Sequence, residues 1–139
     1  MNNKQKRFFK IAREVSLMSD FKRTKIGTVV VEKNRIISTG FNSNKTSRVQ
    51  KEYDRFRDID DLTKYQPKVH AEVAALAPLI NRPNINWKHV SIYIYRELKD
   101  GTVSCSKPCP ACMKLIRELG IKKIYYTEWD GSFVKEEYL

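Results

Sequence analysis

The feature of this sequence that most constrains its fold is a histidine and a pair of cysteines that are distant in the chain but chemically matched. Cys109 and Cys112 are three residues apart, and Cys109 follows His70 by 39 residues. Two residues three apart share a face of a helix, and Pro110 suits the first helical position. Zinc binds thiolate and imidazole ligands, and three protein ligands leave a fourth position for water. We therefore expect two helix starts to meet around one zinc ion.

A carboxylate beside the histidine distinguishes a catalytic zinc site from a structural one. A structural site needs no base, whereas a catalytic site needs one for a water molecule whose pKa the metal can lower to about 7. Glu72 lies two residues after His70. We expect Glu72 to accept a proton from this water, pass it to the substrate, and later protonate the leaving group.

The bulk properties set the class of protein. The chain has 139 residues, which is the size of one domain, and we predict a single domain over residues 1–139. A content of 41% apolar and 31% charged residues is typical of soluble globular proteins. No apolar run approaches the roughly 18 residues of a membrane span, and no hydrophobic segment follows the basic start. We therefore expect no membrane partner and a cytoplasmic location.

The net charge of +11 bears on the partners of the chain. Such an excess of lysine and arginine favours phosphate-bearing partners, either free nucleotides or nucleic acid. A solvated lysine-rich surface would give the same charge. Charge alone does not choose among these three.

Hydrophobic periodicity predicts the order of the elements. Apolar residues at spacings of three and four indicate an amphipathic helix over 4–19. Two β-branched runs, 26–31 and 35–41, indicate a β-hairpin, and the polar segment 42–68 is typical of a functional insertion with a short helix near 50–57. Further predictions are helices over 70–80 and 110–119 and strands over 90–95 and 121–126.

This order predicts a mixed sheet. Each of the last two predicted strands follows a helix, so we expect a β-α-β unit with a right-handed crossover. Pro78 makes the end of the 70–80 helix uncertain, whereas Gly120 is a suitable cap for the 110–119 helix. Residues 127–139 carry no pattern that predicts a structure.

Several motifs in one order resemble a known family. They are Gly40-Phe41-Asn42 at the end of the hairpin, His70-Ala71-Glu72, Pro108-Cys109-Pro110-Ala111-Cys112, and the run 120–126. Together they resemble the cytidine and deoxycytidylate deaminase superfamily, whose signature is His-x-Glu followed by Pro-Cys-x-x-Cys. The resemblance implies an α/β fold of three α-β-α layers, in which a mixed sheet of about five strands carries helices on both faces. It also implies one catalytic Zn²⁺ and a homo-oligomer.

The resemblance assigns roles residue by residue. His70, Cys109 and Cys112 match the zinc ligands, and Glu72 matches the proton shuttle. Asn42 matches an asparagine that contacts the sugar, and Ala71 matches a residue whose backbone amide contacts the base.

The sequence also departs from the family pattern. Ser43 follows Asn42 where many deoxycytidylate deaminases have glycine. Only His89 and Cys105 remain as soft ligands for the second, structural zinc of many relatives, and we do not expect that zinc here.

The substrate is the weaker inference. Lys45 lies close enough to Asn42 in the chain to reach a 5′-phosphate, although a solvated lysine is an equal interpretation. Strand alternation lets only one of Tyr125 and Tyr126 face the site, and we assign Tyr126. The leading hypothesis is deamination of dCMP to dUMP. The alternatives are a deaminase of bases in single-stranded DNA or RNA, a deaminase of free nucleosides or other heterocycles, and a non-catalytic nucleic-acid-binding module on the same fold.

Overall fold

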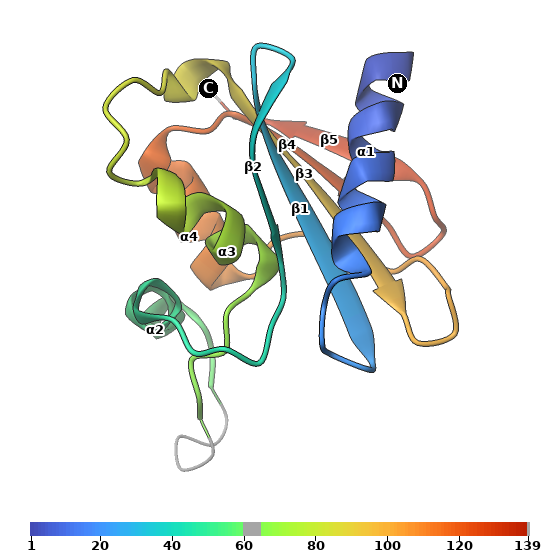
Figure 1. Ribbon diagram of the computed structural model, residues 1–139, viewed down its shortest axis with the longest axis vertical. Helices are drawn as coiled ribbons and strands as arrows, with labels where there is room; N and C mark the ends of the chain where they lie inside the picture. The colour runs from blue at the N-terminus through green and yellow to red at the C-terminus, as the bar shows by residue number, and fades with distance from the viewer. Residues whose placement is uncertain (60–64, 139) are drawn as a thin grey trace.

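A mixed five-stranded sheet between helices forms the framework of the chain (Figure 1). The computed structural model describes residues 1–59 and 65–138. The elements in chain order are α1 (Asn3–Ser16), β1 (Thr24–Glu32), β2 (Arg35–Phe41), α2 (Arg48–Tyr53), η1 (Asp54–Phe56), α3 (Ala71–Leu76), η2 (Ala77–Leu79), η3 (Trp87–His89), β3 (Val90–Leu98), α4 (Pro110–Leu119), β4 (Lys123–Thr127) and β5 (Phe133–Glu137). The strand order is β2-β1-β3-β4-β5.

The predicted hairpin is present. β1 pairs antiparallel with β2 across a two-residue turn, in which Lys33 and Asn34 both have positive φ, as tight hairpin turns require. β1 also pairs antiparallel with β3 along its whole length. β1 is therefore an interior strand, and it begins two residues earlier than the sequence predicted.

The predicted β-α-β unit is also present. β3 and β4 are parallel, and α4 connects them. α4 spans the predicted residues and ends at Gly120, which has φ of 96°. β5 pairs antiparallel with β4 but was not predicted. Its residues alternate between exposed and half-buried on a sheet edge, so it lacks the apolar run that marks an interior strand.

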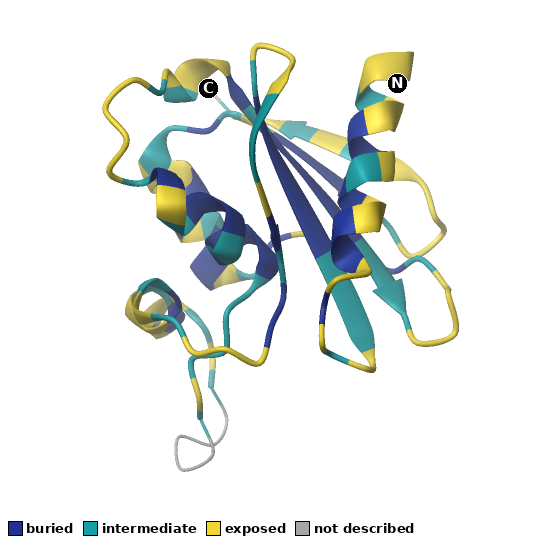
Figure 2. Ribbon diagram, viewed as in Figure 1, coloured by how far each residue is buried: buried dark blue, intermediate teal, exposed yellow. Residues whose placement is uncertain are grey.

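Side chains that alternate along the strands build two separate cores, and the buried stretches of the strands and helices are dark blue in Figure 2. Val30, Ile92 and Ile94 pack toward α3 and α4, whereas Tyr93 and Tyr125 pack toward α1. Helices therefore cover both faces of the sheet, as the resemblance implied (Figure 1).

Two glycines let helices approach the sheet closely. A Cβ atom on Gly27 would lie 2.0 Å from the carbonyl oxygen of Ala12, so α1 lies directly on β1. A Cβ atom on Gly40 would lie 2.4 Å from the backbone nitrogen of Ala75, so α3 lies directly on β2. The second contact fixes the helix that begins at the predicted histidine ligand.

The insertion after the hairpin contains the short helix that the sequence predicted. α2 begins after Ser47, whose side chain accepts a hydrogen bond from the backbone N–H of Gln50. Residues 60–64 of the predicted 42–68 segment lie outside the described residues. The 70–80 helix is shorter than predicted, because the turn that contains Pro78 is 3₁₀ rather than α. Within the described part of the chain, no helix combines the length and apolar character that a membrane span requires.

Candidate active site

The predicted zinc ligands come together in space. His70 Nδ1 lies 3.5 Å from Cys109 Sγ and 3.4 Å from Cys112 Sγ, and the three ligand atoms all lie within 4.8 Å of one another. Around a tetrahedral zinc ion, nitrogen and sulfur ligands are about 3.6 Å apart. The donor set and its spacing therefore fit zinc.

The starts of two helices position these ligands. His70 directly precedes α3, and Cys109 directly precedes α4, with Pro110 as the first helical residue. The helix termini place partial positive charge near the sulfurs, which favours thiolates. Both helices pack on the same face of the sheet, which is why ligands 39 residues apart meet.

A buried side chain from the insertion holds the histidine backbone. Gln50 is 0% exposed, and its Oε1 accepts a hydrogen bond of 2.9 Å from the backbone N–H of His70. Gln50 Nε2 in turn donates to Asp54 Oδ1 at 2.7 Å. Asp54 is buried and also accepts hydrogen bonds from Arg57 and Tyr65. The sequence does not reveal this network, because a glutamine within a charged segment carries no signal of burial.

The ionisable groups of the cluster have shifted pKa values. The hydrogen bond from Cys112 is the largest influence on Cys109 and, with that from His70, lowers the Cys109 pKa to about 4 despite burial. Burial lowers the pKa of His70, but the hydrogen bond to Cys109 and the charge of Glu72 together raise it above its usual value. The lowered pKa favours the thiolate form of Cys109, which is the form that binds a metal, whereas the hydrogen bond with Cys109 and burial raise the pKa of Cys112.

Glu72 lies in the first turn of α3 and is only 5% exposed. Burial raises the pKa of its carboxyl group, and the positive charge of His70 opposes this shift. A carboxyl group whose pKa moves toward neutral pH can both accept and release a proton under physiological conditions.

A cavity of about 450 Å³ opens beside the metal-ligand cluster. His70, Glu72 and Cys109 line it, so the predicted acid-base group and two predicted ligands face the same space. This volume is within the range of small-molecule sites. The cavity is therefore the candidate active site.

The structure brings Asn42 to the cavity. Its side chain ties the start of β1 to the end of β2, because Oδ1 accepts from the backbone N–H of Ile26 at 2.9 Å and Nδ2 donates to the carbonyl oxygen of Thr24 at 3.1 Å. Ala71 is fully buried and is the first residue of α3, where a backbone N–H has no partner within the helix. Its side chain does not line the cavity.

Two predicted substrate contacts lie elsewhere. Lys45 borders a different hollow, beside Thr39 and Ala74, although its carbonyl oxygen accepts a hydrogen bond of 2.9 Å from the backbone N–H of Val69, next to His70. Tyr126 faces the correct side of the sheet but is 4% exposed within the core, and its hydroxyl donates to Glu136 at 2.7 Å. Neither residue lines the active-site cavity.

Four basic residues that the sequence analysis did not select line the cavity: Arg57, Lys68, Arg96 and Lys107. Arg57 and Lys68 come from the two halves of the 42–68 insertion, Arg96 from β3 and Lys107 from the segment before α4, so no local motif connects them. Cys105, one of the two spare soft ligands, also lines this cavity. The other, His89, precedes β3 and lies at the opposite end of that strand.

The sequence of the chain matches a known family over nearly its whole length. Residues 2–128 match the model of the cytidine and deoxycytidylate deaminase zinc-binding region. The chain belongs to this family. It is 29% identical over 130 residues to an uncharacterized deaminase in the luxG 3′ region of Aliivibrio fischeri, covering 93% of this chain and 76% of that protein. It is also 30% identical to a probable deoxycytidylate deaminase of Caenorhabditis elegans, covering 90% of this chain but only 57% of the relative.

Solved structures agree with this membership. The dCMP deaminase of cyanophage S-TIM5 in its apo form is 27% identical with a TM-score of 0.61, covering 94% of this chain and 89% of the phage chain. A cytidine deaminase from Burkholderia pseudomallei is 17% identical with a TM-score of 0.64, covering 99% of this chain and 93% of that chain, and shares the fold. The predicted three-layer fold of this superfamily is therefore confirmed.

Proposed function

We propose that the chain is a zinc-dependent hydrolase that deaminates a cytosine-type base, with dCMP as substrate and dUMP as product. The observation that carries this proposal is the buried carboxyl of Glu72 in a cavity that it shares with His70 and Cys109. A binding-only descendant of the fold has no need of a carboxylate at this position.

His70, Cys109 and Cys112 would hold the zinc. Zinc in such a site supplies Lewis acidity that activates water for attack at neutral pH. The net reaction consumes one water and releases one ammonia, so a C–O bond forms at the ring carbon as the exocyclic C–N bond breaks. Glu72 would carry protons, first to the ring nitrogen and then to the departing amine. The raised pKa of this buried carboxyl suits both transfers.

The charge of the cavity supports a phosphorylated substrate. Four basic side chains line it, and Lys68 and Arg96 are the two without an ion pair among the described residues; the Arg96 guanidinium already donates to Thr24 and to the carbonyl oxygen of Cys105. Lys68 Nζ donates to the carbonyl oxygen of Asn44 at 2.7 Å and has no carboxylate partner among the described residues. Arg57 and Lys107, in contrast, pair with Asp54 and Glu136. We therefore propose Lys68, rather than Lys45, as the phosphate contact.

A related structure supports the same substrate class. The cyanophage S-TIM5 dCMP deaminase has also been solved in complex with dCMP and dUMP, and that structure is 26% identical to this chain with a TM-score of 0.62. In our proposal Asn42 contacts the sugar and the backbone amide of Ala71 contacts the base.

One observation favours a second candidate, deamination of a base within single-stranded nucleic acid. Trp129 is 65% exposed, and the guanidinium of Arg96, which lines the cavity, lies 6.0 Å from its ring centroid. An exposed indole next to a basic cavity is a surface on which a neighbouring base would stack.

The test is ammonia release from the zinc-loaded full chain, with Glu72→Gln as the matched blank. The substrates are cytidine, deoxycytidine, their mono- and triphosphates, and a cytosine-containing single-stranded oligonucleotide. We expect turnover on dCMP that exceeds turnover on deoxycytidine at least tenfold. Turnover confined to the oligonucleotide would establish the second candidate, and no turnover on any substrate would refute the proposal.

A further inference from the structure

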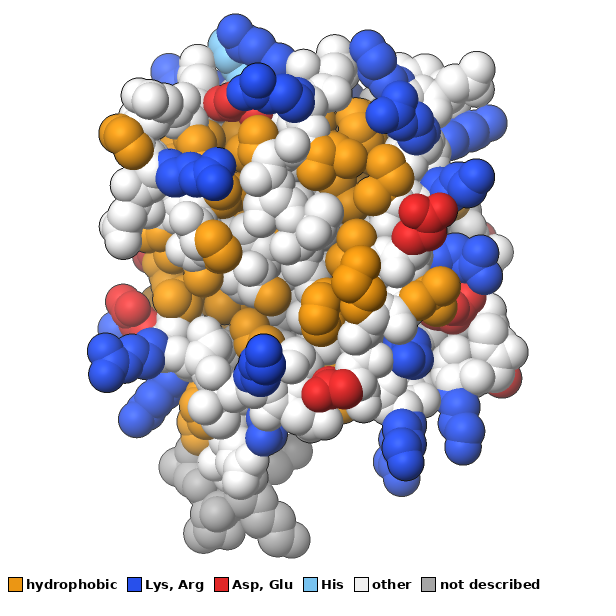
Figure 3. Space-filling view, in the orientation of Figure 1, with side chains coloured by type: hydrophobic (Ala, Val, Ile, Leu, Met, Phe, Trp, Pro, Cys, Tyr) orange, Lys and Arg blue, Asp and Glu red, His pale blue; other side chains and the backbone are white. Residues whose placement is uncertain are grey.

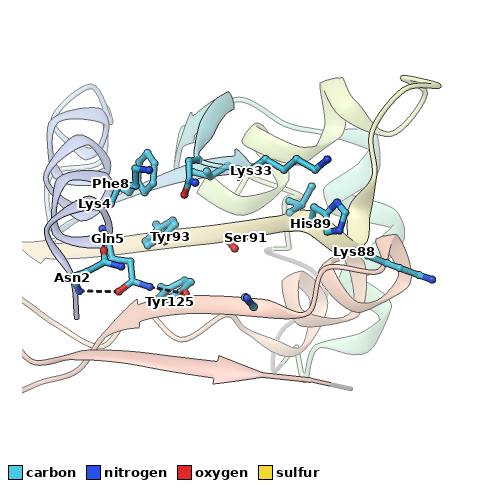
Figure 4. Close-up of a pocket in the computed structure, with 14 residues that line it drawn as sticks. Asn2, Lys4, Gln5, Phe8, Lys33, Lys88, His89, Ser91, Tyr93 and Tyr125 are labelled. Carbon is cyan, nitrogen blue, oxygen red and sulfur yellow. Dashed lines mark hydrogen bonds between the residues drawn. The ribbon is translucent and has the colours of Figure 1, made fainter.

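A second cavity, of about 320 Å³ (Figure 4), is lined by the N-terminal end of β3, whereas the active-site cavity is lined by Arg96 near the other end of that strand. It is formed by the first turns of α1, the turn between β1 and β2, the η3 turn with the start of β3, and the start of β4. Each of these four segments contributes one lysine to its lining, namely Lys4, Lys33, Lys88 and Lys123. No aspartate or glutamate is among the described residues that line it.

The four ammonium groups are not neutralised by their surroundings. Within the described residues, none of them forms an ion pair or a side-chain hydrogen bond. The carboxylates nearest in the fold have other partners. Glu32 accepts a hydrogen bond from the backbone N–H of Asn86, and Glu137, which is opposite Lys123 in the ladder, pairs with Lys135. Basic side chains also gather at this end of the molecule, at the top of Figure 3.

The floor of this cavity consists of packed aromatic rings, so its shape does not depend on a bound ligand. The rings of Tyr93 and Tyr125 stack with centroids 4.3 Å apart and planes at 6°, and Phe8 packs against Tyr93 at 5.2 Å. Gln5 Nε2 donates to the hydroxyl of Tyr125 at 3.1 Å, which ties α1 to the floor. All three rings are at least 96% buried, so the floor holds its shape without a ligand.

A histidine adds a hydrogen-bond donor to the rim. Asn86 Nδ2 lies 3.2 Å from His89 Nδ1, and an amide nitrogen can only donate. When Nδ1 accepts this hydrogen bond, the ring proton is on Nε2, which can donate to a ligand. Figure 4 shows His89 on the same side of the cavity as Lys33 and Lys88, across from Phe8.

We propose that this cavity binds a compact phosphate polyanion, such as the phosphate chain of a nucleotide. Lysine binds phosphate as a point charge, and four lysines around one concavity match a ligand with several negative charges. The volume is at the lower end of the range for small-molecule sites, which suits a short phosphate chain rather than a large ligand.

This site is separate from the candidate active site. Ser91 lines the second cavity and Arg96 lines the first, both on β3. Five residues of a strand span roughly 17 Å. The proposal therefore uses no residue of the metal cluster and stands or falls independently of the deaminase activity.

The test is titration of the full chain with inorganic tripolyphosphate and with a nucleoside triphosphate, followed by calorimetry and amide NMR spectra. We expect saturable shifts at the amides of Lys33 and Ser91. The double variant Lys33→Gln/Lys123→Gln should weaken binding at least tenfold. The matched control Lys99→Gln/Lys122→Gln removes the same charge outside the cavity and should change the affinity less than twofold.

Three results would overturn the proposal. The first is equal weakening in both double variants, which would show attraction to net charge alone. The second is a set of shifts confined to the amides around His70 and Glu72. The third is a single-stranded oligonucleotide that displaces tripolyphosphate with an affinity that rises with its length, which would show an extended nucleic-acid surface. Equal affinity for tripolyphosphate and the nucleoside triphosphate would support recognition of the phosphate chain itself.

Discussion

Replacing Gly40 by alanine should lower kcat strongly while lowering the free energy of unfolding only modestly. The added Cβ atom would lie 2.4 Å from the backbone nitrogen of Ala75 and 2.6 Å from the carbonyl oxygen of Ala71, whereas ordinary contact begins at 3.4 Å. Both atoms belong to the backbone of α3, so no side chain can move aside. The helix itself must shift by about 1 Å, and Glu72 shifts with it.

The magnitudes follow from this displacement. Overpacking of this kind costs about 1–3 kcal/mol, and the lower entropy of the unfolded alanine variant offsets about 0.4–1 kcal/mol of that cost. We expect a net loss of about 1–2 kcal/mol in the free energy of unfolding. A displacement of about 1 Å of a reacting group can lower the rate about 100-fold, and we expect that loss in kcat.

Gly27→Ala is the matched control. Its Cβ atom would lie 2.0 Å from the carbonyl oxygen of Ala12 and 2.5 Å from the backbone nitrogen of Ser16, so it displaces α1 instead. α1 carries none of the residues that line the candidate active site. Thermal unfolding and kcat on dCMP should be measured for both variants below their melting temperatures. The reasoning is refuted if Gly40→Ala is destabilised yet keeps its kcat, or if Gly27→Ala loses kcat to the same extent.

Further predictions concern the cavity and its metal ligands. Glu72→Gln should retain zinc and fold but lower kcat at least 1,000-fold, and a change below tenfold in ammonia release would remove Glu72 from proton transfer. Cys109→Ser should lose bound zinc, measured by atomic absorption, together with turnover; stoichiometric metal in this variant would show that the ligand set is wrong. Lys68→Ala should raise KM for dCMP about tenfold but leave KM for deoxycytidine unchanged, since only the former carries a phosphate. Lys45→Ala, outside the cavity, should change neither KM, and an effect equal to that of Lys68→Ala would restore Lys45 to phosphate recognition.

Some elements of the fold could be predicted because the residues that determine them are adjacent in the chain. The hairpin, α4 with its terminal Gly120, and the helix near Arg48 each follow from a few adjacent residues. β5 could not be predicted, since an edge strand with one exposed face needs no apolar run. The exposed and half-buried residues of Phe133–Glu137 become a strand only because β4 offers a free edge.

The candidate site divides in the same way. His70, Cys109 and Cys112 could be predicted because metal ligation imposes residue types and spacing that sequence displays directly. Lys68 and Arg96 could not, because they reach the cavity from separate segments that only the tertiary fold brings together. Lys45 shows the converse, because its closeness to Asn42 in the chain does not bring it into the lining of the active-site cavity.

The hydrogen bond between Gln50 and the backbone of His70 has a consequence for engineering. Connecting segments tolerate sequence change and carry binding residues, so the segment between β2 and α3 is a natural place to exchange residues when specificity is altered. In this chain such an exchange would remove the acceptor for the amide of a metal ligand, and with it the buried link to Asp54. A chimera that keeps Gln50 and Asp54 should therefore retain its metal site. Transplants in this segment are best confined to residues after Asp54 and before His70.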